Sequence, residues 1–245
     1  MKTLAFALRN TKEILRDKIN LAFGLGFPIV LLLLLSLIQR NVPVDLFSIE
    51  QLSPGVAVFG LSFISLFSAM LIAKDRTTSF MLRLFTSPLT ASNFIAGYTI
   101  PLLPMAILQI IVCLIVSLCL GLALNAKLLL LIVVQIPAAI LFIAIGLLCG
   151  SVFNEKQVGG ICGALLTNVS AWLSGTWFSL DLVGGTFKSI AYMLPFAHAV
   201  DAGRAALAGS YQDIMPHLWW VIAYAVVFVF IAIFTFTRKM NSDNK

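Results

Sequence analysis

Long blocks of apolar residues constrain the fold of this chain more than any other feature. They cover approximately residues 21–38, 54–73, 96–123, 128–150, 157–178 and 218–237. A bilayer core is about 30 Å thick, so roughly 20 helical residues rising about 1.5 Å each are needed to cross it. We therefore predict an all-α integral membrane protein with six transmembrane helices, forming a single domain over residues 1–245.

The composition supports this class and excludes others. Hydrophobic residues make up 60% of the chain and charged residues 11%, whereas soluble domains carry about 25% charged residues. The net charge of +6 forms no continuous basic face with interleaved aromatics, so we predict no nucleic-acid partner. The four cysteines lie in or beside the apolar blocks without a metal-ligand spacing, which favours buried apolar roles and no metal site.

Residues 1–20 differ from the apolar blocks. Leu4, Leu8 and Leu15 fall on one side of a helix and Lys and Arg on the other. Charges interrupt the segment throughout, which argues against a cleaved signal peptide. We predict an amphipathic interfacial helix along the membrane surface before the first span.

The positive charges orient the chain. Cytoplasmic segments carry the excess of Lys and Arg. With the N-terminus inside, only Arg40, Lys127, Lys188 and Arg204 of the 16 Lys and Arg residues fall outside. We predict a multi-pass protein of the plasma membrane with both termini in the cytoplasm.

Residues 179–216, between the fifth and sixth spans, are too long for a turn and too polar to cross the bilayer. They contain two apolar pieces, 187–194 and 196–207, separated at Pro195. Irregular backbone is tolerated at membrane depth only where it packs on protein or lines a cavity. The pattern predicts an outer re-entrant hairpin or an outer cap.

The chain is poor in catalytic groups. It lacks the HExxH, GxSxG and GxxxxGK[ST] patterns. A serine protease built from Ser174 and His198 would lack the expected serine environment. No Asp, Glu, Lys or Arg lies near a span centre, which argues against an ion-driven carrier. Three polar residues within the spans, Gln109, Gln135 and Asn168, fit interhelical hydrogen bonds better than a translocation path.

Residues 74–93 are the most informative stretch. Phe80 with Leu84, and Met81 with Phe85, lie one helical turn apart, and Pro88 ends the pattern. Periodicity alone fits equally well an amphipathic helix that lies in the lipid headgroups and one that docks into a groove of a soluble partner.

This stretch resembles the coupling segment of the ABC-2 type transporter permeases, which reads E-R-E-x-G-T-L-E-x-L-x-x-x-P. Asp75 and Arg76 match the leading acid–Arg pair, Leu84 the later Leu and Pro88 the final Pro. Departures from this pattern include Ser79 in place of Gly, Phe80 in place of Thr and Leu82 in place of the later acid.

A second resemblance precedes the last span. Pro195, Asp201, Arg204 and Gly209 match the family's L-P-x-x-x-x-x-[DE]-x-x-R-x-x-x-x-G in its outer re-entrant helices, and His198 lies within the motif. From spacing alone, an ion pair between Asp201 and Arg204 along one helix is favoured over substrate contact.

The resemblance implies a membrane subunit of an ABC exporter. A cytosolic coupling helix would contact a separate nucleotide-binding ATPase through Asp75, Arg76, Phe80, Arg83, Leu84 and Pro88. ATP and Mg would then bind the partner subunit, and this chain would bind no cofactor and have no ATPase activity of its own. The resemblance further implies a homodimer of permease chains that exports a drug, lipid, glycan or peptide. The alternatives are an ion-gradient-driven secondary carrier or channel and, less favoured, a membrane-embedded enzyme.

Overall fold

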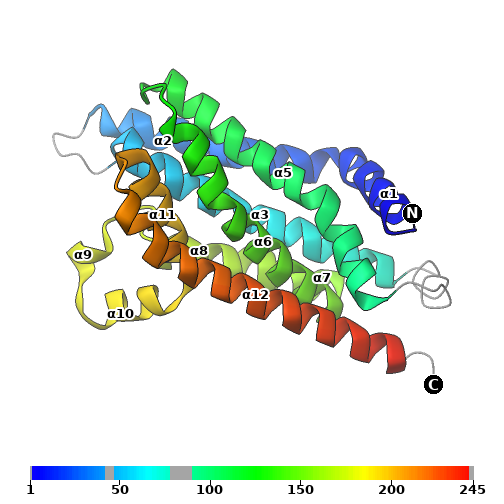
Figure 1. Cartoon of the computed structure of the whole chain (residues 1–245). Coiled ribbons are helices and arrows are strands. Elements are labelled where there is room, and N and C mark those ends of the chain that lie inside the picture. The colour runs from blue at the N-terminus through cyan, green and yellow to red at the C-terminus, as the bar shows by residue number, and fades with distance from the viewer. Residues whose placement is uncertain (1, 42–46, 78–89, 243–245) are drawn as a thin grey trace.

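The structure is a computed structural model that describes residues 2–41, 47–77 and 90–242. Every regular element within these ranges is a helix. The helices run roughly side by side, and the N-terminus and the end of the last helix lie at the same end of the bundle (Figure 1). The predicted all-α class is therefore confirmed.

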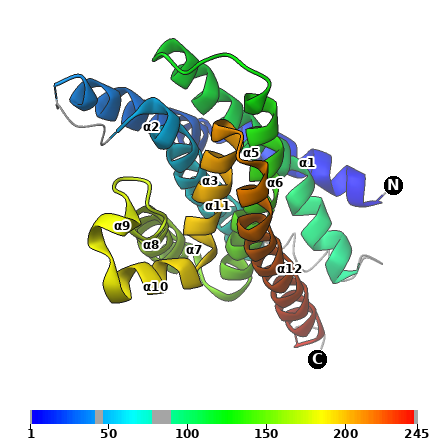
Figure 2. The same cartoon turned by 60° about the vertical axis from the view of Figure 1, so that its left-hand side comes forward.

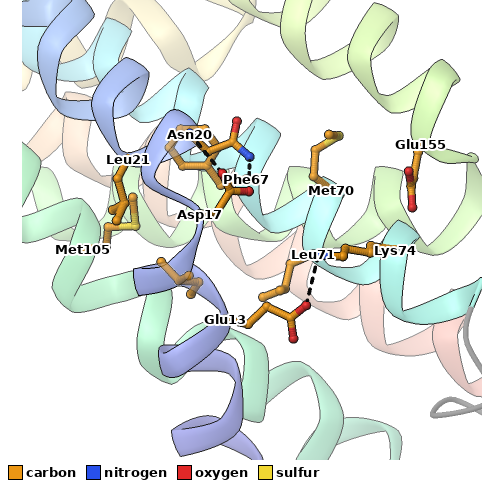
Figure 3. Close-up of a pocket in the computed structure, with 11 residues that line it drawn as sticks. Glu13, Asp17, Asn20, Leu21, Phe67, Met70, Leu71, Lys74, Met105 and Glu155 are labelled. Atoms are coloured by element: carbon orange, nitrogen blue, oxygen red, sulfur yellow. Dashed lines mark hydrogen bonds and ion pairs between the residues drawn. The ribbon is translucent and has the colours of Figure 1, made fainter.

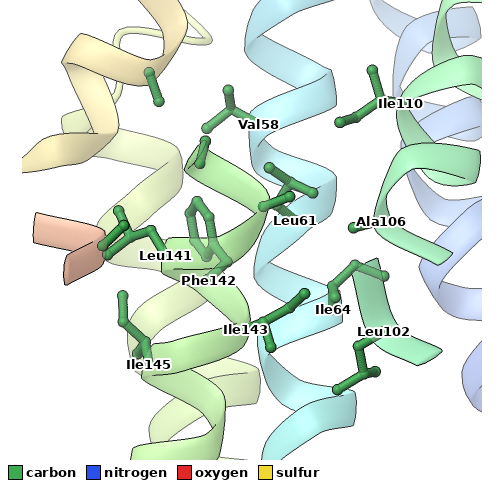
Figure 4. Close-up of a cluster of buried hydrophobic side chains, with 14 of the residues drawn as sticks. Val58, Leu61, Ile64, Leu102, Ala106, Ile110, Leu141, Phe142, Ile143 and Ile145 are labelled. Carbon is green, nitrogen blue, oxygen red and sulfur yellow. The ribbon is translucent and has the colours of Figure 1, made fainter. Parts of the chain in front are cut away.

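Helix α3 (Ile49–Arg76) forms the centre of the bundle. In its apolar 18-residue stretch, 83% is buried inside the protein. It lies between α5 (Ala91–Cys119) and α6 (Lys127–Val152). Figure 4 shows Leu61 and Ile64 of α3 between Ala106 of α5 and Ile143 of α6. Lipid tails are as apolar as these side chains, so close packing, and not the hydrophobic effect, holds such helices together.

Glycines bring α3 and α6 into backbone contact. A Cβ added at Gly146 would lie 1.9 Å from the Ser68 Oγ and 2.1 Å from the Ser65 carbonyl oxygen. One added at Gly150 would lie 2.3 Å from the Ala69 carbonyl oxygen. The pair has the G-x-x-x-G spacing that lets membrane helices approach closely.

Two helices lie on the outside of the bundle. They are α2 (Lys18–Gln39) and α12 (Tyr211–Ser242). In each, only 17% of the apolar 18-residue stretch is buried inside the protein. Large apolar side chains are exposed on both, including Leu34 and Leu37 of α2 and Phe230 and Phe234 of α12. These two faces require lipid or another protein to cover them.

Five of the described helices are long and apolar enough to cross a membrane, namely α2, α3, α5, α6 and α12. The predicted fifth span, residues 157–178, is built differently. It consists of α7 (Glu155–Val158), the π-helix η1 (Gly159–Leu166) and α8 (Thr167–Leu173), which follow one another without a break. The helix stops before residue 178, and Gly175 has a φ of +70°. The count of six spans stays a prediction.

The N-terminal segment divides at Asp17. Helix α1 (Lys2–Arg16) ends there, and the Asp17 carboxylate caps α2 by accepting a hydrogen bond from the Asn20 N–H at 3.2 Å. Leu4, Leu8 and Leu15 are exposed, as expected for a lipid-facing side. Phe6, Ala7 and Asn10 form a second, buried side, which the sequence reasoning missed.

Three short helices occupy the opposite end of the bundle (Figure 2). They are α9 (Leu180–Val183), α10 (Gly185–Met193) and α11 (Pro195–Ala208). Helix α11 is largely buried among α3, α6 and α12. The break between α10 and α11 falls at Leu194, next to the predicted Pro195. Placement of this segment as a re-entrant hairpin stays a prediction.

Candidate functional site

A polar network joins three helices where α3 ends. Arg9 of α1 donates two hydrogen bonds to Asp75, from Nη1 to Oδ2 at 2.6 Å and from Nη2 to Oδ1 at 2.7 Å. The Tyr98 hydroxyl of α5 donates to the Asp75 Oδ2 at 2.8 Å. Only 2% of the Asp75 side chain is exposed. Bidentate Arg–carboxylate pairs of this kind fix the relative orientation of the two side chains in addition to their charge attraction.

More contacts extend this α1–α3–α5 network. Glu13 lies 2.6 Å from the Arg9 Nη2, and the Lys74 Nζ lies 3.3 Å from the other Glu13 oxygen. The buried Asn10 amide donates to the Gly97 carbonyl oxygen at 3.1 Å. Partial burial by itself lowers the pKa of Arg9, but the carboxylates of Asp75 and Glu13 raise it overall, so the guanidinium stays charged.

Helix α1 reaches this position because α5 leaves room for it. The Phe6 ring packs edge-on against Tyr98 at 4.9 Å and Phe94 at 5.5 Å between centroids. A Cβ at Gly97 would lie 2.3 Å from the Phe6 ring. Gly97 therefore permits the contact that places Arg9 beside Asp75.

Arg76 makes a different contact. Its Nη1 donates to the carbonyl oxygens of Gly150 at 3.0 Å and Phe153 at 3.3 Å. These carbonyls lie at the C-terminal end of α6, where backbone acceptors lack helical partners. The neighbouring residues Asp75 and Arg76 thus fasten the end of α3 to α1 and α6, respectively.

A cavity of about 90 Å³ lies beside the network (Figure 3). Its charged lining consists of Glu13, Asp17, Lys74 and Glu155. Its apolar lining includes Leu21, Phe67, Met70, Leu71 and Met105. The cavity therefore offers carboxylates and an apolar surface side by side, which suits an amphipathic group.

The remaining residues of the predicted partner-binding set are Phe80, Arg83, Leu84 and Pro88. They lie outside the described residues. Their contact with an ATPase stays a prediction, as does that of Asp75 and Arg76. The structure adds that the predicted segment begins next to the fastened end of α3.

Arg204 holds the opposite end of the bundle together. Its Nη2 donates to the Gly175 carbonyl oxygen at 2.7 Å, and its Nε donates to the Gln51 carbonyl oxygen at 3.2 Å. The Arg204 Nη1 also lies 3.4 Å from the Asp201 Oδ1, so the intrahelical ion pair is present. One side chain of α11 thereby links α3 and the turn after α8.

The other residues of the second motif surround this link. Pro195 is the first residue of α11, a position where its missing N–H costs nothing. Gly209 ends α11 with a left-handed φ of +83°, and the Lys127 Nζ donates to the Ala208 carbonyl oxygen at 2.9 Å. His198 lies 2.8 Å from His217 between their Nδ1 atoms. The motif residues therefore begin and end α11, and His198 connects α11 to α12.

Tyr192 connects α10 to α11. Its hydroxyl donates to the Asp201 Oδ2 at 2.7 Å. Burial raises the pKa of Tyr192, and the hydrogen bond and charge of Asp201 raise it further. The phenol therefore stays protonated and keeps donating to Asp201.

Of the three polar residues of the spans, Gln135 makes the predicted interhelical hydrogen bond, whereas the hydrogen bonds of Gln109 and Asn168 lie within their own helical segments. Gln135 Nε2 donates to the Ala199 carbonyl oxygen of α11 at 3.4 Å, an interhelical bond. Gln109 Nε2 donates to the Cys113 Sγ at 3.3 Å within α5, and the Gln109 side chain packs against Gly60 of α3. Asn168 is exposed and donates to the Ala164 carbonyl oxygen at 2.8 Å. Their role in a translocation path stays a prediction.

Replacing Arg204 by lysine is expected to lower the free energy of unfolding by about 2 kcal/mol, because a single ammonium cannot reach two separate carbonyls and Asp201 at once. Thermal unfolding of the detergent-solubilised protein measures this. Lys188→Gln is the matched control, because it removes an exposed ion pair with Asp181 and a distant contact with the Tyr192 ring, and it is expected to cost less than about 1 kcal/mol. Equal losses in the two variants would contradict the bridging role of Arg204.

Sequence reasoning missed Arg9, Glu13 and Tyr98. In the sequence, Arg9 is one of several positive charges of the amphipathic segment 1–20, and Tyr98 lies inside the apolar block 96–123. Arg9 is 66 positions from Asp75 along the chain. The available signal was the spacing of Phe6 and Asn10, which marks a second buried side on α1.

Comparison with known proteins gives one family. The family model described as ABC-2 type transporter matches residues 1–208. A search of the curated proteins gives no match. The matched region includes α1, the α1–α3–α5 network and all of α11.

Proposed function

The chain belongs to the ABC-2 type transporter family, whose members are membrane subunits of ABC transporters, and from this we propose that it is the permease of an ATP-driven exporter. A separate nucleotide-binding subunit hydrolyses ATP. This chain carries the substrate outward by alternating access. The observation that supports the proposal best is the family match over 208 of 245 residues.

The contacts of Asp75 and Arg76 at the end of α3 support a mechanism for coupling ATP hydrolysis to transport. A segment that follows directly on Arg76 transmits a push only if its attachment point is rigid. The two-pronged Arg9–Asp75 pair and the Arg76 contacts with α6 supply that rigidity. Movement of residues 78–89 by the ATPase would then displace α1, α3 and α6 together.

An amphipathic or lipid-like substrate fits the lining of the cavity beside the network. Its carboxylates and apolar side chains suit a molecule with a polar head and an apolar body. The volume of about 90 Å³ is below the roughly 300–1,000 Å³ of pockets that enclose a drug-sized ligand. In this conformation the cavity accepts part of such a molecule.

The assembly contains two permease chains, most simply a homodimer. The exposed apolar faces of α2 and α12 are areas that lipid and a second chain would cover. The end of the bundle with α1 faces the cytoplasm, because the excess of Lys and Arg lies in the segments predicted there. The end with α9, α10 and α11 then faces outward.

The purified chain is expected to hydrolyse no ATP alone and to co-purify with a nucleotide-binding subunit. In inside-out vesicles, ATP should drive accumulation of an amphipathic dye without any ion gradient. Transport that needs an ion gradient and no ATPase would favour the carrier alternative. Accumulation in right-side-out vesicles with internal ATP would reverse the proposed direction.

Reversing the charge of Arg83 with Glu is expected to reduce transport per ATP by roughly 5- to 150-fold, the span of typical coupling free energies, while the protein stays folded. A proline inserted next to Phe80 should act in the same way, because it interrupts a helix. Transport and ATP hydrolysis are measured together in proteoliposomes. Arg40→Glu is the matched control, an exposed charge in an outer segment. Unchanged transport in both coupling variants would contradict the coupling assignment.

A further inference from the structure

The two histidines of the chain meet between α11 and α12. Their Nδ1 atoms are 2.8 Å apart, a hydrogen-bonding distance, although the residues are 19 positions apart in sequence. His198 is 6% exposed, and its ring stacks on Trp220 of α12 at 5.3 Å with an interplanar angle of 8°. The contact is therefore a built part of the α11–α12 interface.

The surroundings of His198 determine where the protons lie. Its Nε2 is 3.0 Å from the Tyr192 carbonyl oxygen, which can only accept a hydrogen bond. The Nε2 of His198 therefore carries hydrogen, and its Nδ1 in the neutral ring is an acceptor. The His217 Nδ1 must then donate, which leaves a lone pair on the His217 Nε2.

A first added proton is compatible with this arrangement. It binds the His217 Nε2, because the other three ring nitrogens already take part in hydrogen bonds. The His217 Nδ1 still donates, and the bond becomes charge-assisted. A second proton has only the His198 Nδ1 left to bind. Two N–H groups would then face each other at 2.8 Å, and the contact could not persist.

Some neighbouring groups raise the pKa of His198 and others lower it. Burial lowers its pKa most, the Tyr192 carbonyl raises it, the nearby His217 lowers it and Asp201 raises it, with a net lowering. The Trp220 face favours a charged ring. Other charged groups on these helices include Arg204 on α11 and Asp213, one turn before His217 on α12. Lys188 on α10 lies with its Nζ 5.8 Å from the centre of the Tyr192 ring.

We propose that His198 and His217 form a proton-binding site that locks α11 to α12, holds with one added proton and opens when a second binds. The ligand is the proton itself. The two rings titrate as a coupled pair. Opening would separate the start of α11, with the end of α10 attached to it, from α12.

Nitrogen NMR tests the site directly, because the chain has only two histidines. The full chain is labelled with ¹⁵N-histidine, carries a purification tag without histidine and is placed in lipid nanodiscs. At pH 8 the expected protonated atoms are the His198 Nε2 and the His217 Nδ1. On acidification the second proton should bind the His198 Nδ1, below the ordinary histidine pKa of about 6.5.

A variant without His217 separates the effect of the second ring on the pKa of His198 from the effect of burial. In His217→Phe, His198 loses its charged neighbour and should titrate in one step, roughly one pH unit above the second step of the unmodified pair. Trp219→Phe is the matched control, because Trp219 is 66% exposed on α12 next to the stacked Trp220. It should leave both steps unchanged.

A fluorescence measurement tests the opening. Trp220 is kept as the single tryptophan by replacing Trp172, Trp177 and Trp219 with Phe. Its emission and its access to iodide should change with the second step and not the first. Other tautomers at pH 8, independent titration of both rings near pH 6.5, or a Trp220 signal that follows the first step would each overturn the proposal. The spectrum of the unmodified chain decides the tautomers even if a variant fails to fold.

The sign of the stability effect follows from the lowered His198 pKa. The unfolded chain binds the proton more readily than the folded chain below about pH 6.5. The stabilisation is therefore complete above that pH and is lost as the pH falls through the lower folded pKa. Thermal unfolding between pH 8 and 5 should show a decline that is smaller in the His217→Phe variant.

Discussion

Replacing Gly146 by alanine is expected to lower the free energy of unfolding by about 3 kcal/mol. The added Cβ would lie 2.1 Å from the Ser65 carbonyl oxygen, a backbone atom that no side-chain rotation can move. The two helices must separate, and α3 then loses packing along its contact with α6. With roughly 2–4 °C for each kcal/mol in a protein of this size, the melting temperature should fall by about 6–12 °C.

Gly26→Ala is the matched control. Gly26 also lies within a predicted span, in α2, but a Cβ there would meet nothing within 4 Å. Alanine has the higher helix propensity, so this variant is expected to be neutral or more stable by up to about 1 kcal/mol. Fluorescence-detected size-exclusion after heating measures both variants side by side. A stable Gly146→Ala protein would show that α3 and α6 are not in backbone contact.

Replacing Arg9 by methionine is expected to cost about 2 kcal/mol and to weaken the coupling of ATP hydrolysis to transport. The change leaves the buried Asp75 carboxylate without its guanidinium partner. Breaking a fully buried pair costs about 3–5 kcal/mol, but 34% of the Arg9 side chain is exposed and water moderates the loss. Thermal unfolding and the ratio of transport to ATP hydrolysis are the measurements.

The partner variants give this prediction an internal control. Asp75→Asn is expected to cost less than Arg9→Met, because Arg9 keeps Glu13 and some contact with water. The double variant with both changes should regain part of the stability, since no buried charge remains unpaired. If the two single losses simply add in the double variant, the ion pair contributes nothing and α1 is held by its other contacts, the Phe6 packing and the Asn10–Gly97 hydrogen bond among them.

The apolar blocks predicted the long helices well because a span has a fixed length. Five expected spans coincide with single helices, α2, α3, α5, α6 and α12, apart from their ends. The observed helix ends differ from the predicted span ends because a helix can continue through polar residues beyond the apolar stretch. Helix α3 runs on through Lys74, Asp75 and Arg76, so these residues end a spanning helix and do not begin a separate one.

Contacts between distant segments could not be predicted in the same way. The spacing of Gly146 and Gly150 is visible in the sequence, but nothing there says that α3 is the helix they approach. The buried side of α1 is short, because Phe6 and Asn10 are only one turn apart. The His198–His217 contact depends on the turn at Gly209, which fixes how α12 returns along α11.

That turn also determines how α11 would move. Gly209 and Ser210 are the only residues between α11 and α12, and the Lys127 Nζ holds the end of α11 through the Ala208 carbonyl. In the proposed opening, α11 would pivot about Gly209 once the Arg204 contacts with Gln51 and Gly175 give way. His198 lies 11 positions away, or about 16 Å along the helix. A swing of about 10° would carry it about 3 Å, enough to break a hydrogen bond. A hinge of one glycine thus acts as a lever that amplifies a small rotation into the loss of a single bond.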